Sequence, residues 1–122
     1  MSGSEPTGHG PVLPVFTVHT ETQGDATVVR CRGRLIAGTT SILQTPVKRL
    51  ITEHKRVVLD LTDVTQMDSM GMGAVIALYV SGKRAGCKVE LVNLSQRVRE
   101  LFSMTNVLSL FEVAGDQSSR MP

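Results

Sequence analysis

The densest apolar stretch of the chain, residues 57–80, divides into a strand pattern followed by a helix pattern. Its first five residues are Val or Leu except for Asp60, which predicts a short strand buried on both faces. Residues 62–66 are mostly polar and predict a loop. Asp68 and Ser69 then precede an uncharged apolar run, and either suits a helix N-cap because its side-chain oxygen can accept a free backbone N–H. We therefore expect a helix that begins beside Ser69, just past the end of a central strand.

Weaker patterns on either side predict the remaining elements. Gly24-Asp25 lies between two segments rich in Val and Thr, which is typical of a β-hairpin, and Gly33 is expected to end its second strand. Apolar residues at helical spacing surround Pro46, where the helix either kinks or restarts with Thr45 as its cap. The expected elements in chain order are strands at 15–21 and 26–32, a helix at 39–52, a strand at 57–61, a helix from 69, a strand at 88–93, a short helix capped by Ser95 and a strand at 110–113.

This order of elements predicts an α/β fold. Helices that alternate with strands from the middle of the chain onward imply βαβ units and a mostly parallel sheet, to which the opening hairpin adds an antiparallel edge. The 122 residues suit one domain, which we place at residues 15–113. Residues 1–14 are rich in Gly, Ser and Pro, and residues 114–122 are polar. We expect them to form a disordered arm and a flexible tail that supply no core residues.

The composition narrows the classes of function. A net charge of +2, one Tyr, three Phe and no Trp leave few side chains to stack on bases, so direct binding to nucleic acid is not expected. Cys31 and Cys87 lack metal-ligand spacing, and we interpret them as small core residues in a reducing compartment. No 18-residue apolar run and no signal-peptide pattern are present, so we expect a cytoplasmic protein without membrane insertion.

Ser69 has no catalytic constellation around it. A nucleophilic serine needs a neighbouring base, and the three histidines lie apart from every motif. The G-x-S-x-G pattern of a nucleophile elbow is also missing. Gly71 and Gly73 are not followed by the Lys-Ser/Thr pair of a phosphate-binding loop, so close packing of the helix explains them better. Because no cluster has metal-ligand spacing either, we predict no enzyme activity, no cofactor and no metal site.

The helix that begins near Ser69 is apolar on two faces. The bulky stripe, which we assign to the core, consists of Met72, Val75, Ile76 and Tyr79. A second face follows at spacing i, i+4, i+7 and i+11 and consists of Met70, Ala74, Ala77 and Ser81. A helix that is apolar all round is buried on both sides or offers one face to a partner. In a domain of this size, we expect the second face to bind a partner.

The place of Ser69 at the helix mouth makes it a candidate for modification rather than catalysis. Phosphorylation adds about −1.5 to −2 charge units, which the free N–H groups and the dipole of a helix N-terminus tolerate. A partner that docks over the apolar face would then meet a bulky dianion beside Asp68. The alternative is that Ser69 serves only as the helix N-cap.

Several of these motifs together resemble the STAS domain, the family of sulfate transporters and anti-sigma-factor antagonists. The most specific segment is Asp68-Ser69-Met70-Gly71-Met72-Gly73, preceded by Leu59-Asp60-Leu61. Further segments similar to the family are Gly33-Arg34-Leu35, Gly86 through Asn93, and Val98 through Thr105. The resemblance implies a STAS-like mixed, mostly parallel β-sheet with helices packed on it, which agrees with the order of elements above.

The resemblance also implies a function. In stand-alone bacterial members of the family, the serine after the Asp is phosphorylated by the partner, an anti-sigma factor with serine-kinase activity. The unphosphorylated protein binds that factor and frees the sigma factor, and a serine phosphatase resets the switch. Carried over, the phosphosite is Ser69. The residues then expected at the partner-binding surface are Asp68, Ser69, Met70, Gly71, Ala74 and Ala77.

Three positions depart from the family pattern and bear on the identity of the partner. Arg34 and Ile36 stand where the family often has acidic residues, in a loop that lies near the phosphosite in the family. Met70 replaces a residue that is commonly small. The alternative function is that of a STAS scaffold, or a subunit of a stress-signalling or transporter complex, without a sigma-factor partner.

Overall fold

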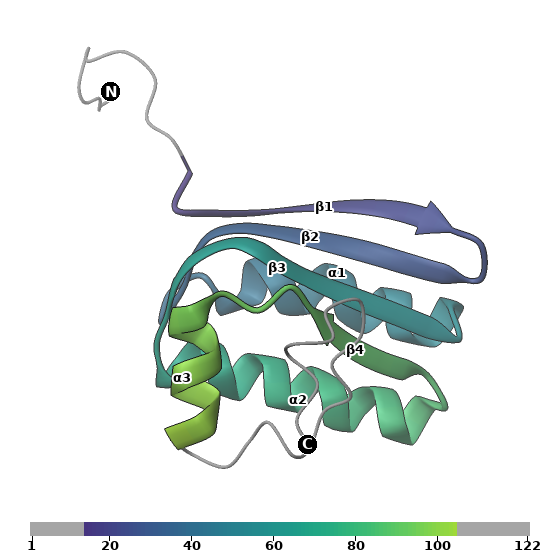
Figure 1. Ribbon diagram of the computed structural model, residues 1–122. Coiled ribbons are helices and arrows are strands. Elements are labelled where there is room, and N and C mark those ends of the chain that lie inside the picture. The colour runs from purple at the N-terminus through teal and green to yellow at the C-terminus, as the bar shows by residue number, and fades with distance from the viewer. Residues whose placement is uncertain (1–13, 105–122) are drawn as a thin grey trace, which may run out of the picture.

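A four-stranded mixed sheet with helices on one side forms the protein (Figure 1), and the computed structural model describes residues 14–104. The sheet order is β1-β2-β3-β4, with β1 antiparallel to β2 and the other neighbours parallel. The predicted fold class is therefore confirmed. The elements are β1 (Phe16–Gln23), β2 (Ala26–Leu35), α1 (Thr40–Glu53), β3 (Arg56–Met67), α2 (Ser69–Ala85), β4 (Lys88–Val92) and α3 (Gln96–Met104).

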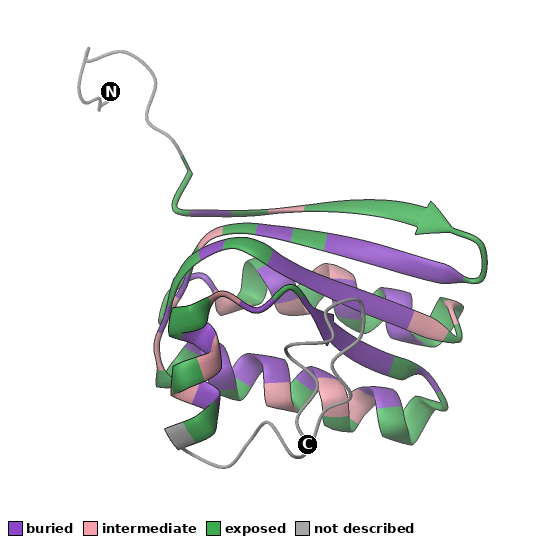
Figure 2. Ribbon diagram, in the orientation of Figure 1, coloured by how far each residue is buried: buried purple, intermediate pink, exposed green. Residues whose placement is uncertain are grey.

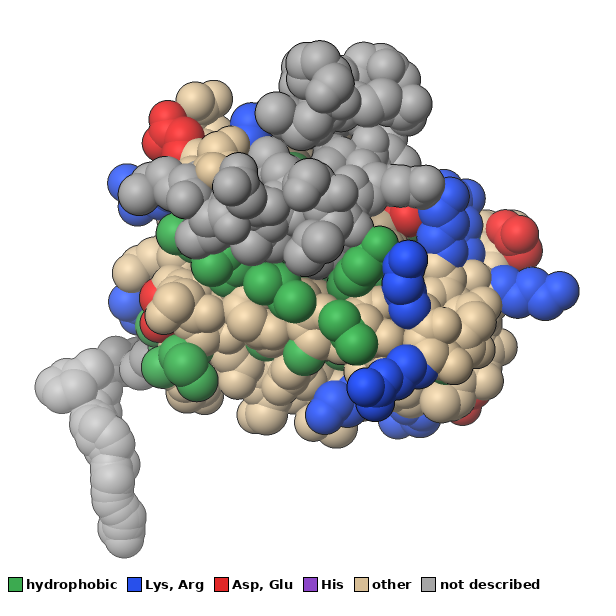
Figure 3. Space-filling view, turned by 90° about the horizontal axis from the view of Figure 1, so that it is seen from below, with side chains coloured by type: hydrophobic (Ala, Val, Ile, Leu, Met, Phe, Trp, Pro, Cys, Tyr) green, Lys and Arg blue, Asp and Glu red, His purple; other side chains and the backbone are tan. Residues whose placement is uncertain are grey.

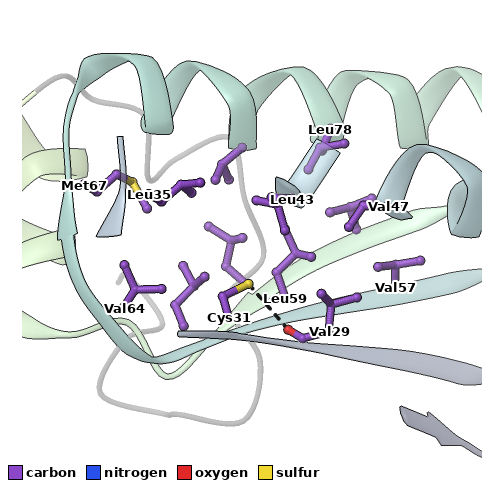
Figure 4. Packing of buried hydrophobic residues seen from close by; sticks show 14 of the residues in the cluster. Val29, Cys31, Leu35, Leu43, Val47, Val57, Leu59, Val64, Met67 and Leu78 are labelled. Atoms are coloured by element: carbon purple, nitrogen blue, oxygen red, sulfur yellow. Dashed lines mark hydrogen bonds between the residues drawn. The ribbon is translucent and has the colours of Figure 1, made fainter. Parts of the chain in front are cut away.

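The main core lies between the sheet and the two long helices α1 and α2. Alternate residues of β3 point into it, among them the fully buried Val57, Leu59 and Leu61. They meet Leu43 and Val47 of α1 and Leu78 of α2 (Figure 4). Buried residues follow β2, β3 and β4, whereas β1 is largely exposed (Figure 2). Both cysteines are buried, as the sequence predicts.

β2 and β3 are longer than their sequence patterns indicate, and both predicted ends are wrong. β2 does not stop at Gly33 but continues to Leu35, and β3 runs through the residues 62–66 that we expected to form a loop. Two register shifts in the β2–β3 pairing accommodate the extra residues of β3. Strand pairing with β2 thus overrides the polar local sequence, because Val64 and Met67 still reach the core.

The structure decides between the two alternatives for the helix around Pro46 and confirms the predicted cap of α3. α1 is one helix that continues through Pro46, so no second helix restarts at Thr45. Ser95 caps α3 as predicted, because its Oγ accepts the N–H of Val98 at 3.2 Å. The predicted strand at 110–113, residues 1–13 of the N-terminal arm and the tail at 114–122 lie outside the described residues.

Candidate functional site

Asp68 fixes the N-terminus of α2 against the loop between β2 and α1. Its Oδ1 accepts the N–H of Gly71 at 2.9 Å, and its Oδ2 accepts the N–H of Ala37 at 3.0 Å. These two hydrogen bonds, first that from Ala37 and then that from Gly71, hold the pKa of the Asp68 carboxyl below its ordinary value. Asp68 is therefore the N-cap of α2. The alternative in which Ser69 caps the helix is wrong.

Gly71 lets the first turn of α2 approach the end of β2. A Cβ built on Gly71 would overlap the carbonyl oxygen of Leu35, which is backbone and cannot rotate away. The Asp68 N–H also points to this carbonyl, at 3.4 Å. Gly73 differs, since a Cβ there would meet nothing within 4 Å. Close packing therefore explains the first glycine of the pair, as we expected, but not the second.

Ser69 and Met70 occupy the first two positions of α2, and both are exposed. Met70 is 59% exposed, more than the other exposed large apolar residues Val15, Ile42 and Val80. The hydroxyl group of Ser69 and the apolar side chain of Met70 thus lie together at the N-terminus of α2. The Asp68 hydrogen bonds hold this position fixed relative to the neighbouring loop.

Two residues that we expected at the partner-binding surface are buried. Ala74 is only 5% exposed, and Gly71 lies against Leu35. α2 packs against α1 as well as against the sheet, so its buried face is wider than the stripe predicted from spacing. The prediction that Ala74 and Gly71 present themselves to a partner is corrected accordingly. Ile76 and Tyr79, which we assigned to the core, are only partly buried.

The exposed side of α2 is apolar or small in character. We call it the outer face of α2, and it consists of Ser69, Met70, Gly73, Ala77 and Val80. Val80 is 44% exposed, so bulky apolar groups stand at both ends of this face. In Figure 3, apolar side chains spread across the centre of the helix layer, with Lys and Arg toward one end. An exposed apolar surface of this kind is typical of a protein-binding site.

The loop that follows β2 borders this surface. Leu35 pairs with Met67, and Arg34 pairs with Gln66, which places the loop beside the segment that leads into α2. Arg34 is exposed and Ile36 is half-buried. The two positions that depart from the family pattern therefore adjoin the candidate phosphosite.

A second polar cluster, centred on Asp60, escaped the sequence analysis. Asp60 is 7% exposed; its Oδ1 accepts from Thr62 N at 3.0 Å, Thr62 Oγ1 at 2.6 Å and Asn93 Nδ2 at 3.2 Å. Arg30 Nη1 donates to its Oδ2 at 3.2 Å. Burial alone would raise the pKa of Asp60, but these donors together lower it. The cluster joins β2, β3 and the turn after β4, and the one charged residue in an apolar strand was its only sequence signal.

Two kinds of feature are absent from the part of the chain that the structure describes. No helix there is long and apolar enough to cross a bilayer. No group of three or more His, Cys, Asp and Glu side chains in residues 14–104 is placed to hold a metal ion.

The comparison with protein families decides the identity of the domain. A sequence model of the STAS domain matches residues 17–118, most of the chain. The protein belongs to the STAS-domain family. The anti-sigma-B factor antagonist of Bacillus subtilis is 30% identical to this STAS protein over 84 residues, 65% of this chain and 77% of that protein.

Two solved structures share the fold at low sequence identity. The Bacillus cell fate determinant SpoIIAA in its phosphorylated form is 17% identical, with a TM-score of 0.64 over 84% of this chain and 96% of SpoIIAA. SLC26A9 is 15% identical, with a TM-score of 0.67 over 87% of this chain but only 23% of SLC26A9. The same fold thus occurs both as a small protein and as a part of a much larger one.

Proposed function

We propose that this STAS protein is an anti-sigma-factor antagonist whose activity is switched at Ser69. In its unphosphorylated form it binds an anti-sigma factor with serine-kinase activity, and the sigma factor is released. Phosphorylation of Ser69 by that kinase ends the binding, and a serine phosphatase restores it. The observation that carries the proposal is the exposed Ser69 hydroxyl at the mouth of α2, next to the exposed apolar side chain of Met70.

The unphosphorylated surface suits a protein partner. Met70, Ala77 and Val80 offer apolar contact, and no charged residue interrupts α2 before Lys83. Binding there would remove exposed apolar area from water, and this burial favours association. The hydrogen bonds of Asp68 keep the helix start in place, so little ordering is needed when the partner binds.

A phosphate on Ser69 would change this surface without unfolding the helix. The N-terminus of α2 tolerates an anion, because the helix dipole is positive there, and the Asp68 carboxylate already accepts the Gly71 N–H at this end. A docked partner, by contrast, would have to cover about −1.5 to −2 charge units beside the ionised Asp68. Desolvation of that charge opposes the contact with Met70. The switch therefore acts on binding rather than on folding.

The relatives support this function over the alternative. The B. subtilis relative, 30% identical, is an anti-sigma-B factor antagonist, and SpoIIAA is known in a phosphorylated form. The fold match to SLC26A9 supports the alternative, a STAS subunit of a larger assembly. The two functions differ in whether Ser69 accepts a phosphate from an anti-sigma kinase.

An intact-mass measurement tests the proposal. The protein is incubated with ATP, Mg²⁺ and each purified serine-kinase-type anti-sigma factor of the source cell. We expect one kinase to add the mass of a single phosphoryl group, and Ser69→Ala to abolish the addition. Ser41→Ala is the matched control, because Ser41 is also an exposed serine in the first turn of a helix. Co-purification with a multi-subunit complex and no phosphate uptake from any kinase would instead support the alternative.

A further inference from the structure

Positive charge gathers at one end of the helix layer. The first parts of both long helices, residues 40–47 and 69–82, contain no charged residue. The second parts carry four exposed cations, Lys48 and Arg49 on α1 and Lys83 and Arg84 on α2. α1 and α2 each connect parallel strands, so both run in the same direction and their C-terminal ends lie together. Figure 3 shows Lys and Arg side chains gathered toward the right of this layer.

These four charges have no ion-pair partner in the described part of the chain, residues 14–104. The only acidic residue within α1 and α2 is Glu53. By contrast, Arg30 and Arg56 on the sheet pair with Asp60 and Glu90.

Helix stabilisation explains only part of this pattern. Lys83 and Arg84 lie in the last turn of α2, where a cation is favoured by the helix dipole. Lys48 and Arg49 lie before the last turn of α1, and that last turn contains no basic residue. The helix dipole therefore does not explain these two cations. The Lys83 ammonium stands 5.6 Å from the ring centre of Tyr79, and this contact holds its charge on the helix layer. A surface for an acidic partner accounts for all four cations.

We propose that the basic end of the helix layer (Lys48, Arg49, Lys83 and Arg84) binds an acidic patch on the same partner protein that covers the outer face of α2. This inference rests on the proposed function. It adds that the partner carries an acidic patch, and that the partner extends from the outer face of α2 toward the C-terminal ends of the two helices. The basic end lies next to Val80, so the apolar and basic surfaces are continuous along α2. Complementary charge raises the rate of encounter and sets the orientation of docking.

A protein fits this surface better than a membrane or a nucleic acid. Interfacial helices carry Trp, Phe or Leu along one face and cations along the whole opposite face. Here the cations occupy one end only, and the outer face of α2 consists of Ser, Met, Gly, Ala and Val. A nucleic acid would leave that apolar face uncovered.

The basic end is far enough from Ser69 to act independently of the switch. Lys83 lies fourteen positions after Ser69 in α2, or about 20 Å along the helix at a rise of 1.5 Å per residue. The screening length is about 10 Å at 0.1 M salt, so a phosphate on Ser69 is largely screened from Lys83. Steering by charge and switching by phosphate should therefore give additive effects on affinity.

The test measures affinity for the kinase that modifies Ser69, without ATP, at about 0.1 M and about 1 M salt, where the screening length falls from about 10 Å to about 3 Å. The variant is K83E/R84E. Its matched control is R32E/R97E, a double charge reversal at exposed positions on β2 and α3. Circular dichroism verifies that both fold. We expect K83E/R84E to bind at least tenfold more weakly at the lower salt, about 1.4 kcal/mol, and to lose most of the salt dependence. The control should keep the wild-type affinity and salt dependence.

Each other outcome overturns a stated part of the inference. If the kinase binds the wild type and both double variants equally, the basic end has no role, while the proposed function stands. If no kinase binds the wild type, the proposed function fails and the inference fails with it. If the wild type sediments with phosphatidylserine vesicles and K83E/R84E does not, the basic end is a lipid-binding surface and the acidic protein partner is wrong.

Discussion

The two faces of α2 have nearly the same composition and opposite surroundings. Gly71 and Ala74 lie on the buried face, where a Cβ added to Gly71 would overlap the backbone of β2. Gly73 and Ala77 lie on the outer face, where a Cβ on Gly73 would meet nothing within 4 Å. Residue type alone therefore does not distinguish packing from binding in this helix. The difference arises from the neighbours, α1 and the end of β2.

The buried face and the outer face of α2 therefore have different roles. The buried face holds the helix on the fold, and the outer face is available to a partner. Substitutions on the buried face should change the free energy of unfolding. Substitutions on the outer face should change the affinity for the kinase and leave folding nearly unaltered.

The largest expected effect on stability separates the two glycines. Gly71→Ala places a methyl group onto the Leu35 carbonyl, so the helix must shift, at a cost of about 3 kcal/mol or more. Gly73→Ala should instead stabilise the protein by up to about 1 kcal/mol, because Ala is the better helix former and has open space. Urea denaturation of both variants measures the difference. Similar midpoints for the two would show that the first turn of α2 does not pack as described.

The next largest effect on stability distinguishes Ala74 on the buried face from Ala77 on the outer face. Ala74→Glu forces a carboxylate into a buried site and should cost about 2 kcal/mol or more. Ala77→Glu adds the same side chain on the exposed face, so the unfolding midpoint should hardly move while binding of the kinase weakens. The pair is compared by denaturation and by titration with the kinase. A stable Ala74→Glu that no longer binds would restore the original assignment of Ala74 to the partner-binding surface.

A smaller effect on stability concerns Asp68, the N-cap residue of α2. The pKa of Asp68 is lowered in the folded protein, so its carboxylate stabilises the fold above its unfolded pKa. That stability is lost as the pH falls below about 4 toward the folded value. Asp68→Asn keeps an acceptor for the Gly71 N–H but does not titrate. Its free energy of unfolding should therefore fall less steeply than that of the wild type below about pH 4; parallel curves would contradict the role of Asp68.

The sequence predicted those features that depend on local pattern. The strand at 57–61, the helix start at Asp68-Ser69 and the Ser95 cap all rest on spacing and capping chemistry within a few residues. The extension of β3 was missed because it depends on pairing with β2, which is distant in the sequence. Ala74 was misplaced for the same kind of reason, since only the packing of α1 beside α2 decides which apolar residues of α2 are covered.

In the candidate site too, features that depend on local pattern were predicted, and contacts between distant segments were not. Spacing and the family resemblance pointed to Ser69, Met70 and Ala77, and the structure exposes all three. The hydrogen bond from Ala37 to Asp68 joins residues 31 positions apart, and no sequence pattern signals it. The polar cluster around the buried Asp60 likewise requires Arg30 and Asn93 to meet across three segments.

The most direct test of the switch is the affinity of the kinase for the protein before and after phosphorylation of Ser69. We predict that the phosphorylated form binds at least tenfold more weakly, a loss of about 1.4 kcal/mol, with an unchanged circular dichroism spectrum. Ser69→Asp should shift the affinity in the same direction but less, because it adds one charge where the phosphate adds about −1.5 to −2. Ser69→Ala should bind like the unphosphorylated wild type and remain bound when ATP is supplied. Equal affinities of the phosphorylated and unphosphorylated forms would contradict the account and leave Ser69 without a regulatory role.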